Sequence, residues 1–137
     1  MALLMIQGYV SPLIGRKVRD SQFLVHWLPQ IVRDIGMQAV GDPVVEQYSH
    51  WSGNSPSVTQ FIEAPSRIPT HTTGVQIVTA SAVTVHTYPD EFVQILIDSC
   101  LEIPAHHLVR NKIMAALNMT PDYTYYDARW GWRGGQI

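Results

Sequence analysis

Apolar and β-branched residues gather in six stretches of the chain, and we interpret each stretch as a strand. The stretches are residues 3 to 10, 38 to 51, 73 to 81, 82 to 88, 92 to 100 and 122 to 130. The second is interrupted at Gly41, Asp42 and Pro43, which are typical turn residues. Short turns join several of these strands, and such turns connect antiparallel neighbours.

Two other stretches have apolar residues at the three- and four-residue spacing of a helix. The first runs from residue 20 to residue 36, and its apolar face consists of Phe23, Leu24, Trp27, Leu28, Ile31 and Val32. Asp20 or Ser21 can cap its start, and Gly36 ends it. The second runs from residue 104 to residue 119, with an apolar side of Leu108, Ile113, Met114 and Leu117.

Two stretches show no sustained period, so we expect loops there. Residues 11 to 18 are broken by Pro12 and Gly15, and residues 52 to 72 are rich in Ser, Pro, Thr and Gly. The resulting order of elements is β-α-β-β-β-β-α-β. This order predicts an α+β fold, a two-layer α/β sandwich in which two helices cover one face of a mainly antiparallel sheet.

Length and composition limit the classes of protein that fit. The 137 residues suit a single domain that spans residues 1 to 137. The net charge is −2 and the basic residues cluster only in GRKVR, residues 15 to 19, so we expect no nucleic-acid partner. The single cysteine, Cys100, excludes an intramolecular disulfide and favours a reducing, cytoplasmic location. The apolar start MALLMIQGYV is too short to span a bilayer and lacks the basic region of a signal peptide, so we expect no membrane association.

Candidate chemistry is concentrated in TASAVTVHTYPDE, residues 79 to 91. Ser81 lies at the junction of two predicted strands, His86 lies near the end of the second, and Cys100 ends the next strand. Residues five apart point to opposite faces of a regular strand, so a bend or bulge would be needed to bring Ser81 and His86 together. Because neighbouring strands are expected to be antiparallel, we expect the three residues near one edge of the sheet.

Each candidate also has an ordinary structural explanation. Ser81 fits a strand-end hydroxyl bonded to backbone, and a lone cysteine in a strand is most often a small buried hydrophobic residue. Asp90 and Glu91 follow Tyr-Pro and have the composition of an exposed turn. His106 and His107 are adjacent at a helix start, and no partner follows three or four residues later, so we expect no metal site.

The segment TTGVQIVTASAVTVHTYPDEFVQILIDSC, residues 72 to 100, resembles the bacterial and archaeal S-adenosylmethionine decarboxylase family. The family pattern has a Ser or Thr before Gly-Val, an apolar strand, the segment Glu-Ser-His-Ile-Ser-Ile-His-Thr-Trp-Pro-Glu, and a strand that ends in Cys. The serine, the histidine, the Thr-aromatic-Pro-acid run and the cysteine stand in the same order here. The preceding WLPQIVRDIGMQAVGDPVV, residues 27 to 45, is similar to the family's first helix and second strand.

The resemblance implies pyruvoyl chemistry and a homodimer. In the family a serine attacks the carbonyl of the preceding residue, the chain breaks through an ester, and β-elimination leaves a pyruvoyl cofactor on the new N-terminus. Its ketone forms a Schiff base with the substrate amine and accepts the electrons released with carbon dioxide. Carried over to this chain, cleavage falls between Ala80 and Ser81. The substrate is then a small molecule, S-adenosylmethionine on the route to polyamines or another amino acid, and Asp90 or Glu91 matches the carboxylate that binds the ribose hydroxyls.

The resemblance also implies a role for four other groups. Ser81 is the pyruvoyl precursor, and Thr73 stands where a hydroxyl assists processing. His86 stands where a base removes the serine α-proton. Cys100 matches the acid that reprotonates the substrate carbon, a role for which a thiol near the site is chemically suited.

The chain also departs from the family pattern. Ala80 replaces the Glu before the serine, Ala82 the His after it, and Tyr88 the Trp. The interval from Ser81 to Cys100 is one residue shorter than in the family. Since neither alanine replaces the nucleophile, the self-cleavage chemistry is retained in principle. The alternative is a non-processing homologue that binds a small molecule or another protein without catalysis.

Overall fold

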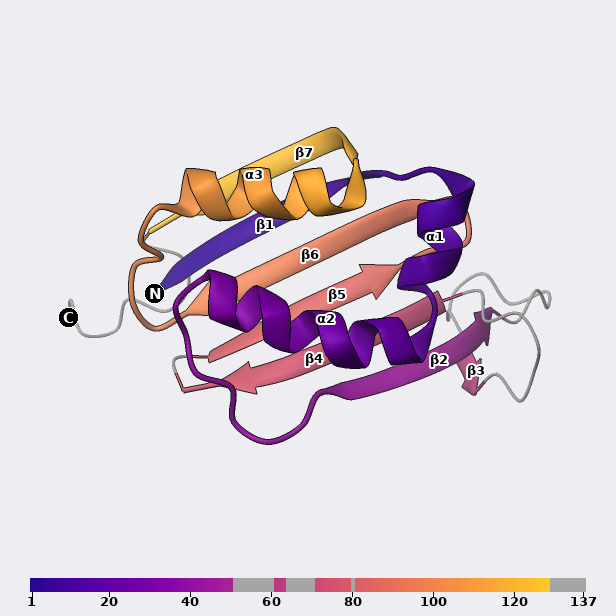
Figure 1. Cartoon of the computed structure of the whole chain (residues 1–137), viewed down its shortest axis with the longest axis horizontal. Helices are drawn as coiled ribbons and strands as arrows, with labels where there is room; N and C mark the ends of the chain where they lie inside the picture. The colour runs from indigo at the N-terminus through magenta and orange to yellow at the C-terminus, as the bar shows by residue number, and fades with distance from the viewer. Residues whose placement is uncertain (51–60, 64–70, 80, 129–137) are drawn as a thin grey trace.

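The computed structural model describes residues 1–50, 61–63, 71–79 and 81–128. The strands in this part of the chain are β1 (Ala2–Tyr9), β2 (Val44–His50), β3 (Phe61–Glu63), β4 (His71–Val78), β5 (Ser81–Thr87), β6 (Phe92–Ser99) and β7 (Thr120–Asp127). They form one seven-stranded sheet in the order β3-β2-β4-β5-β6-β1-β7, and each neighbouring pair is antiparallel. The described helices are α1 (Pro12–Val18), α2 (Ser21–Asp34) and α3 (His106–Leu117), and all three lie on one face of the sheet (Figure 1).

The predicted α+β fold is confirmed, with an antiparallel sheet in one layer and helices in the other. α2 packs on β4 and β2, and α3 packs on β1 and β7 (Figure 1). α2 lies within the predicted helix. Asp20, one of the two predicted caps, accepts a hydrogen bond from the Gln22 N–H at 2.9 Å. Gly36 follows its end with a φ of 74°, a conformation that suits glycine. Within the described residues, no helix is both long and apolar enough to cross a membrane.

The prediction of a loop over residues 11 to 18 is wrong, because the segment forms α1 and adds a third helix to the covered face. Ser11 caps it by accepting a hydrogen bond from the Ile14 N–H at 3.2 Å. Pro12 occupies the start of the helix, where its missing N–H and fixed φ are favourable. Gly15 lies inside the helix because a Cβ there would collide with the carboxylate of Glu91. Of the two residues that suggested a loop, Pro12 therefore starts the helix and Gly15 leaves room for the Glu91 carboxylate.

The predicted loop over residues 52 to 72 is wrong at two points. Phe61–Glu63 forms β3 and pairs with β2, and β4 begins at His71. A three-residue edge strand is too short to show a period in the sequence. The remainder of this predicted loop, residues 52–60 and 64–70, lies outside the described residues.

The core lies between the helices and the sheet, where alternate strand residues face the helices. Its members include Leu4, Ile6, Leu24, Leu28, Ile31, Val32, Val83, Val85, Val93, Ile95, Ile97, Val109, Ile113 and Leu117. Leu108, which we expect on the apolar side of α3, is 69% exposed. The buried stripe of α3 instead repeats every four residues from Val109.

The opposite face of the sheet carries none of the described helices, and we call it the open face. Its side chains include Leu3, Met5, Thr73, Val75, Ile77, Ala82, Thr84, His86, Leu96, Asp98, Tyr123 and Tyr125, by the alternation of buried and less buried positions. Ile77 is 56% exposed and Tyr123 is 47% exposed. Exposed apolar side chains on an uncovered sheet face are typical of a surface that packs against another protein.

Candidate functional site

Ser81 and Asp98 form a hydrogen-bonded pair at the start of β5. Ser81 is the register partner of Ser99 on β6, and Ala82 is the partner of Asp98. The Ser81 hydroxyl donates a hydrogen bond to Oδ1 of Asp98, and the Ala82 N–H donates to the same oxygen at 3.2 Å. A carboxylate in this position can accept the hydroxyl proton, and a base next to a serine activates it as a nucleophile.

The backbone at Ser81 is close to fully extended, with a φ of 157°. The predicted scissile bond joins Ser81 to Ala80, and Ala80 lies outside the described residues. The structure therefore describes the proposed nucleophile and its carboxylate partner, together with the strand that follows them.

Asp98 is the residue that sequence analysis missed. It lies in IDSC, between the buried residues Ile97 and Ser99, so alternation alone predicts that its side chain is on the open face. A polar residue on the exposed face of a strand is common, and nothing in the sequence connects it with Ser81. The connection comes from the register of β5 against β6.

Thr73 and His86 form a second pair, near the opposite end of β5. They are register partners on β4 and β5, and Thr73 Oγ1 lies 3.2 Å from His86 Nδ1. With the ring proton on Nε2, Nδ1 accepts the hydrogen bond from the Thr73 hydroxyl. Burial lowers the pKa of His86 from its ordinary value of 6.5, so the ring is neutral near pH 7. A neutral imidazole is the form that accepts a proton.

Ser81 and His86 do not lie together within one chain, so the expectation of a single cluster near one edge is wrong. β5 has no bulge against either neighbour, and its register with β4 and β6 is continuous from Ser81 to Thr87. Five residues of strand at about 3.3 Å each separate the two by about 16 Å. The chain therefore carries two half-sites, Ser81 with Asp98 and Thr73 with His86.

Cys100 belongs to the Ser81 half-site by position. It follows Ser99, the register partner of Ser81, and its thiol is exposed. The interpretation of Cys100 as a small buried hydrophobic residue is therefore wrong. Its exposure leaves the thiol accessible to a ligand beside Ser81.

Asp90 and Glu91 lie in the turn between β5 and β6 and have different surroundings. The Tyr88 N–H donates to the Phe92 carbonyl at 3.0 Å and closes the turn, on which Asp90 is exposed. Glu91 forms an ion pair with Arg19 at 3.0 Å, and Arg19 also donates to the Tyr88 carbonyl at 3.2 Å. Glu91 thus connects the turn to the end of α1, whereas Asp90 remains accessible to a ligand.

No group of three or more His, Cys, Asp or Glu side chains in the described ranges could hold a metal ion. The chemistry available at the two half-sites is that of a hydroxyl, a carboxylate, an imidazole and a thiol. These groups can carry out acyl transfer and proton transfer.

The fold that holds these half-sites is the fold of a known class of enzyme. The adenosylmethionine decarboxylase from Aquifex aeolicus VF5 is similar in structure, with a TM-score of 0.61 over 96% of this chain and 92% of that chain, at 15% sequence identity. The chain therefore has the α+β fold of an adenosylmethionine decarboxylase, and the similarity extends far beyond the motif at residues 72 to 100. No protein-family model and no curated protein sequence matches the chain.

Proposed function

We propose that this protein is a pyruvoyl-dependent decarboxylase of S-adenosylmethionine that forms its cofactor by cleavage between Ala80 and Ser81. The observation that carries the proposal is the hydrogen bond from the Ser81 hydroxyl to Asp98, at the position that the motif assigns to the processed serine. The fold, which an adenosylmethionine decarboxylase shares, supports it. The pyruvoyl group supplies a ketone that accepts electrons when the substrate loses carbon dioxide.

In this proposal Asp98 takes the hydroxyl proton as Ser81 Oγ attacks the carbonyl carbon of Ala80. The C–N bond then breaks, the amine of Ser81 takes up a proton, and an ester joins the two residues. A base removes the α-proton of Ser81, and the C–O bond to the Ala80 carboxylate breaks. Water converts the resulting enamine to the ketone with release of ammonia. The products are the chain that ends in the Ala80 carboxylate, the chain that begins with the ketone, and ammonia. No oxidant or reductant takes part.

His86 is the base in this sequence, and a second copy of the chain brings it to Ser81. In this dimer the open faces of two copies lie against each other, related by a two-fold axis that runs between the sheets and across the strands. The axis places the His86 end of β5 in one copy opposite the Ser81 end of β5 in the other. The open face provides the apolar contact surface, with Ile77 at 56% exposure. The proposed homodimer thus assembles two complete sites from four half-sites, and Thr73 positions the His86 ring in each.

Cys100 and Asp90 complete the proposed site. The exposed Cys100 thiol lies one residue beyond the partner of Ser81, where it can return a proton to the substrate carbon. Asp90 is exposed on the turn next to His86 and can accept hydrogen bonds from the ribose hydroxyls. Glu91, the other carboxylate with this expected role, is already paired with Arg19.

One observation favours the second candidate function, a binding protein without catalysis. Ala80 and Ala82 flank Ser81, so neither neighbour supplies a side chain that takes part in acid–base chemistry. In that case the Ser81–Asp98 hydrogen bond has the structural role of joining the ends of β5 and β6.

Release of labelled carbon dioxide from carboxyl-labelled S-adenosylmethionine tests the proposed activity. Wild-type protein should release the label, and Ser81→Ala should not. Thr84→Ala is the matched control, since it removes a hydroxyl from the open face of β5 outside both half-sites. Release from another amino acid but not from S-adenosylmethionine would overturn the substrate, and no release from either would favour the binding protein.

A further inference from the structure

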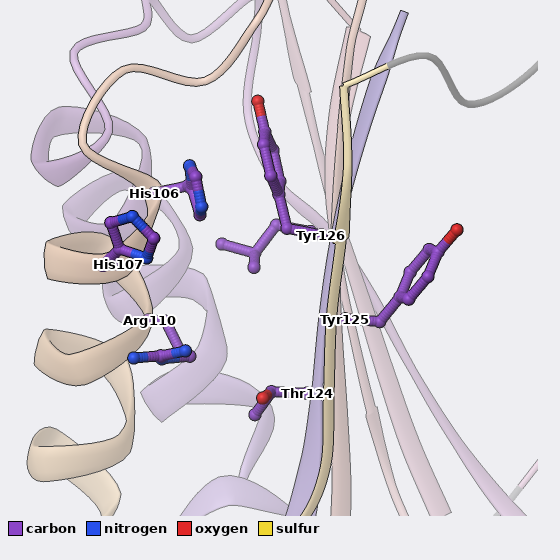
Figure 2. A pocket seen from close by; sticks show the side chains of 7 residues that line it. His106, His107, Arg110, Thr124, Tyr125 and Tyr126 are labelled. Carbon is purple, nitrogen blue, oxygen red and sulfur yellow. The ribbon is translucent and has the colours of Figure 1, made fainter.

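A cavity of about 150 Å³ lies between α3 and β7, on the face of the sheet that the helices cover. It is lined by Leu4, His106, His107, Arg110, Thr124, Tyr125 and Tyr126. Figure 2 shows His106, His107 and Arg110 on the side of α3, Thr124 and Tyr126 facing them from β7, and the Tyr125 side chain directed away. Neither half-site of the proposed enzyme contributes to this cavity, because none of Ser81, Asp98, Thr73 and His86 lines it.

The cavity is lined by basic side chains and by no acidic ones. Arg110 is cationic, His106 and His107 add two imidazoles, and no acidic residue is among the lining residues. The ion pairs of the described residues are Arg19 with Glu91 and Lys112 with Asp34, so Arg110 takes part in neither. Its described hydrogen bond runs from Nε to Asn111 Oδ1 at 3.2 Å. A half-buried guanidinium next to a cavity is a strong donor for an anion.

The side chains around the cavity are held in place before any ligand binds. His106 stacks on Tyr126 with ring centroids 3.7 Å apart and an interplanar angle of 15°. The Tyr126 hydroxyl accepts a hydrogen bond from the Ile103 N–H at 3.1 Å, which fixes the ring on which His106 rests. His107 lies beside His106 at 3.9 Å between centroids. Such preorganisation lowers the cost of ordering side chains around a ligand.

The same end of α3 adds to the positive potential. Ala105 is the N-cap residue and has no side chain that can accept hydrogen bonds from the first turn. His106 and His107 are the first two residues of α3, so the positive end of the helix dipole lies beside them. Burial, followed by the positive charges of His107 and Arg110, lowers the pKa of His106, and Glu102 acts in the opposite direction.

We infer that this cavity binds a phosphate group, either free or at the end of a small phosphorylated molecule. The guanidinium of Arg110 matches two phosphate oxygens, and the imidazoles and the Thr124 hydroxyl can donate to the others from two sides. A doubly charged tetrahedral anion gains more from such a set than a singly charged planar carboxylate. A cavity of about 150 Å³ is large enough for benzene, so phosphate and a short attached group fit in it.

Calorimetric titration of the full-length Ser81→Ala chain tests this inference independently of processing. The probes are inorganic phosphate, glycerol 3-phosphate and acetate. We expect saturable binding of phosphate or the phosphomonoester, and a loss of about tenfold or more in affinity for Arg110→Gln. Arg16→Gln on α1, at the other end of the sheet, is the matched control and should bind like the parent (Figure 1). Tighter binding of glycerol 3-phosphate than of inorganic phosphate identifies a phosphorylated small molecule, and equal binding identifies the free ion.

Three outcomes would overturn the inference. They are no saturable binding of either phosphate probe, acetate binding as tight as phosphate binding, and unchanged affinity in Arg110→Gln. His107→Asn provides a second variant at an exposed position, where the fold is not at risk, and it should also weaken binding. In an NMR titration, bound phosphate should raise the pKa of His106, because it opposes the charges of His107 and Arg110 and adds to that of Glu102.

Discussion

Thr73 and His86 face each other across β4 and β5, with 3.2 Å between the hydroxyl oxygen and the ring nitrogen Nδ1. The hydrogen bond fixes the orientation of the imidazole, as partners of catalytic histidines commonly do. Thr73→Val removes the hydroxyl at nearly constant volume. It should lower the free energy of unfolding by about 1 kcal/mol and slow self-cleavage. Thr73→Ser should restore both, whereas Thr84→Val should leave the cleavage rate unchanged.

The pH dependence of stability tests the burial of His86. Its pKa is lower in the folded chain than the 6.5 of an unfolded chain, so the unfolded chain binds more protons between those two values. The free energy of unfolding therefore falls as pH decreases below about 6.5. Urea unfolding should show that the stability advantage of wild type over His86→Asn shrinks between about pH 7.5 and about pH 5. A difference that stays constant or grows over this range would contradict the assignment.

Gly15 and Glu91 test the packing of α1 on the turn after β5. Alanine is ordinarily better than glycine inside a helix by about 1 kcal/mol. Gly15→Ala should nevertheless give no such gain, because its Cβ displaces the Glu91 carboxylate from Arg19 and the lost ion pair offsets about 1 kcal/mol. Adding Glu91→Ala removes the obstacle, so the double variant should be more stable than the sum of the single changes predicts. Additive effects in denaturant unfolding would refute the contact.

The sequence predicted those parts of the molecule that repeat a regular pattern. The spacing of Leu24, Leu28 and Ile31 defined α2, and β-rich runs located most of the strands, so the antiparallel α+β fold could be predicted. α1 was missed because Pro12 and Gly15 are ambiguous in a sequence. Proline starts helices as well as ending them, and the packing reason for Gly15 is a carboxylate far along the chain.

The arrangement of the half-sites could not be predicted in the same way. The order of Thr73, Ser81, His86 and Cys100 was apparent from the motif, but their distances depend on strand register. An uninterrupted β5 separates Ser81 from His86, and the register with β6 brings Asp98 to Ser81. A pattern along one strand contains no information about the residue opposite on the next strand.

The open face should join two copies of the chain. We expect a solution mass of twice 15.4 kDa for wild type by light scattering. Leu96→Arg puts a charge in the middle of the open face and should yield single chains, because an unpaired buried charge is costly. Leu108→Arg, at a 69% exposed position on the helical side, should remain a dimer. Wild type with the mass of one chain would contradict the dimer, as would dissociation of both variants.

Co-expression of two inactive variants tests whether the site is shared between copies. In mixed dimers of Ser81→Ala and His86→Ala, one site contains the intact Ser81 of the second variant and the intact His86 of the first. The His86→Ala chain should then be cleaved, and the Ser81→Ala chain should stay whole. If neither chain is cleaved in the mixture while wild type is, the complete site lies within one copy.

The intact mass of purified wild-type protein tests the central claim most directly. We expect two fragments, residues 1 to 80 and residues 81 to 137, with the second fragment blocked to Edman sequencing because its amine has become a ketone. Ser81→Ala should keep its full mass, and Asp98→Asn should be cleaved far more slowly because the proton acceptor of Ser81 is lost. A wild-type chain that keeps its full mass of 15.4 kDa after prolonged incubation would contradict the account and favour a binding protein.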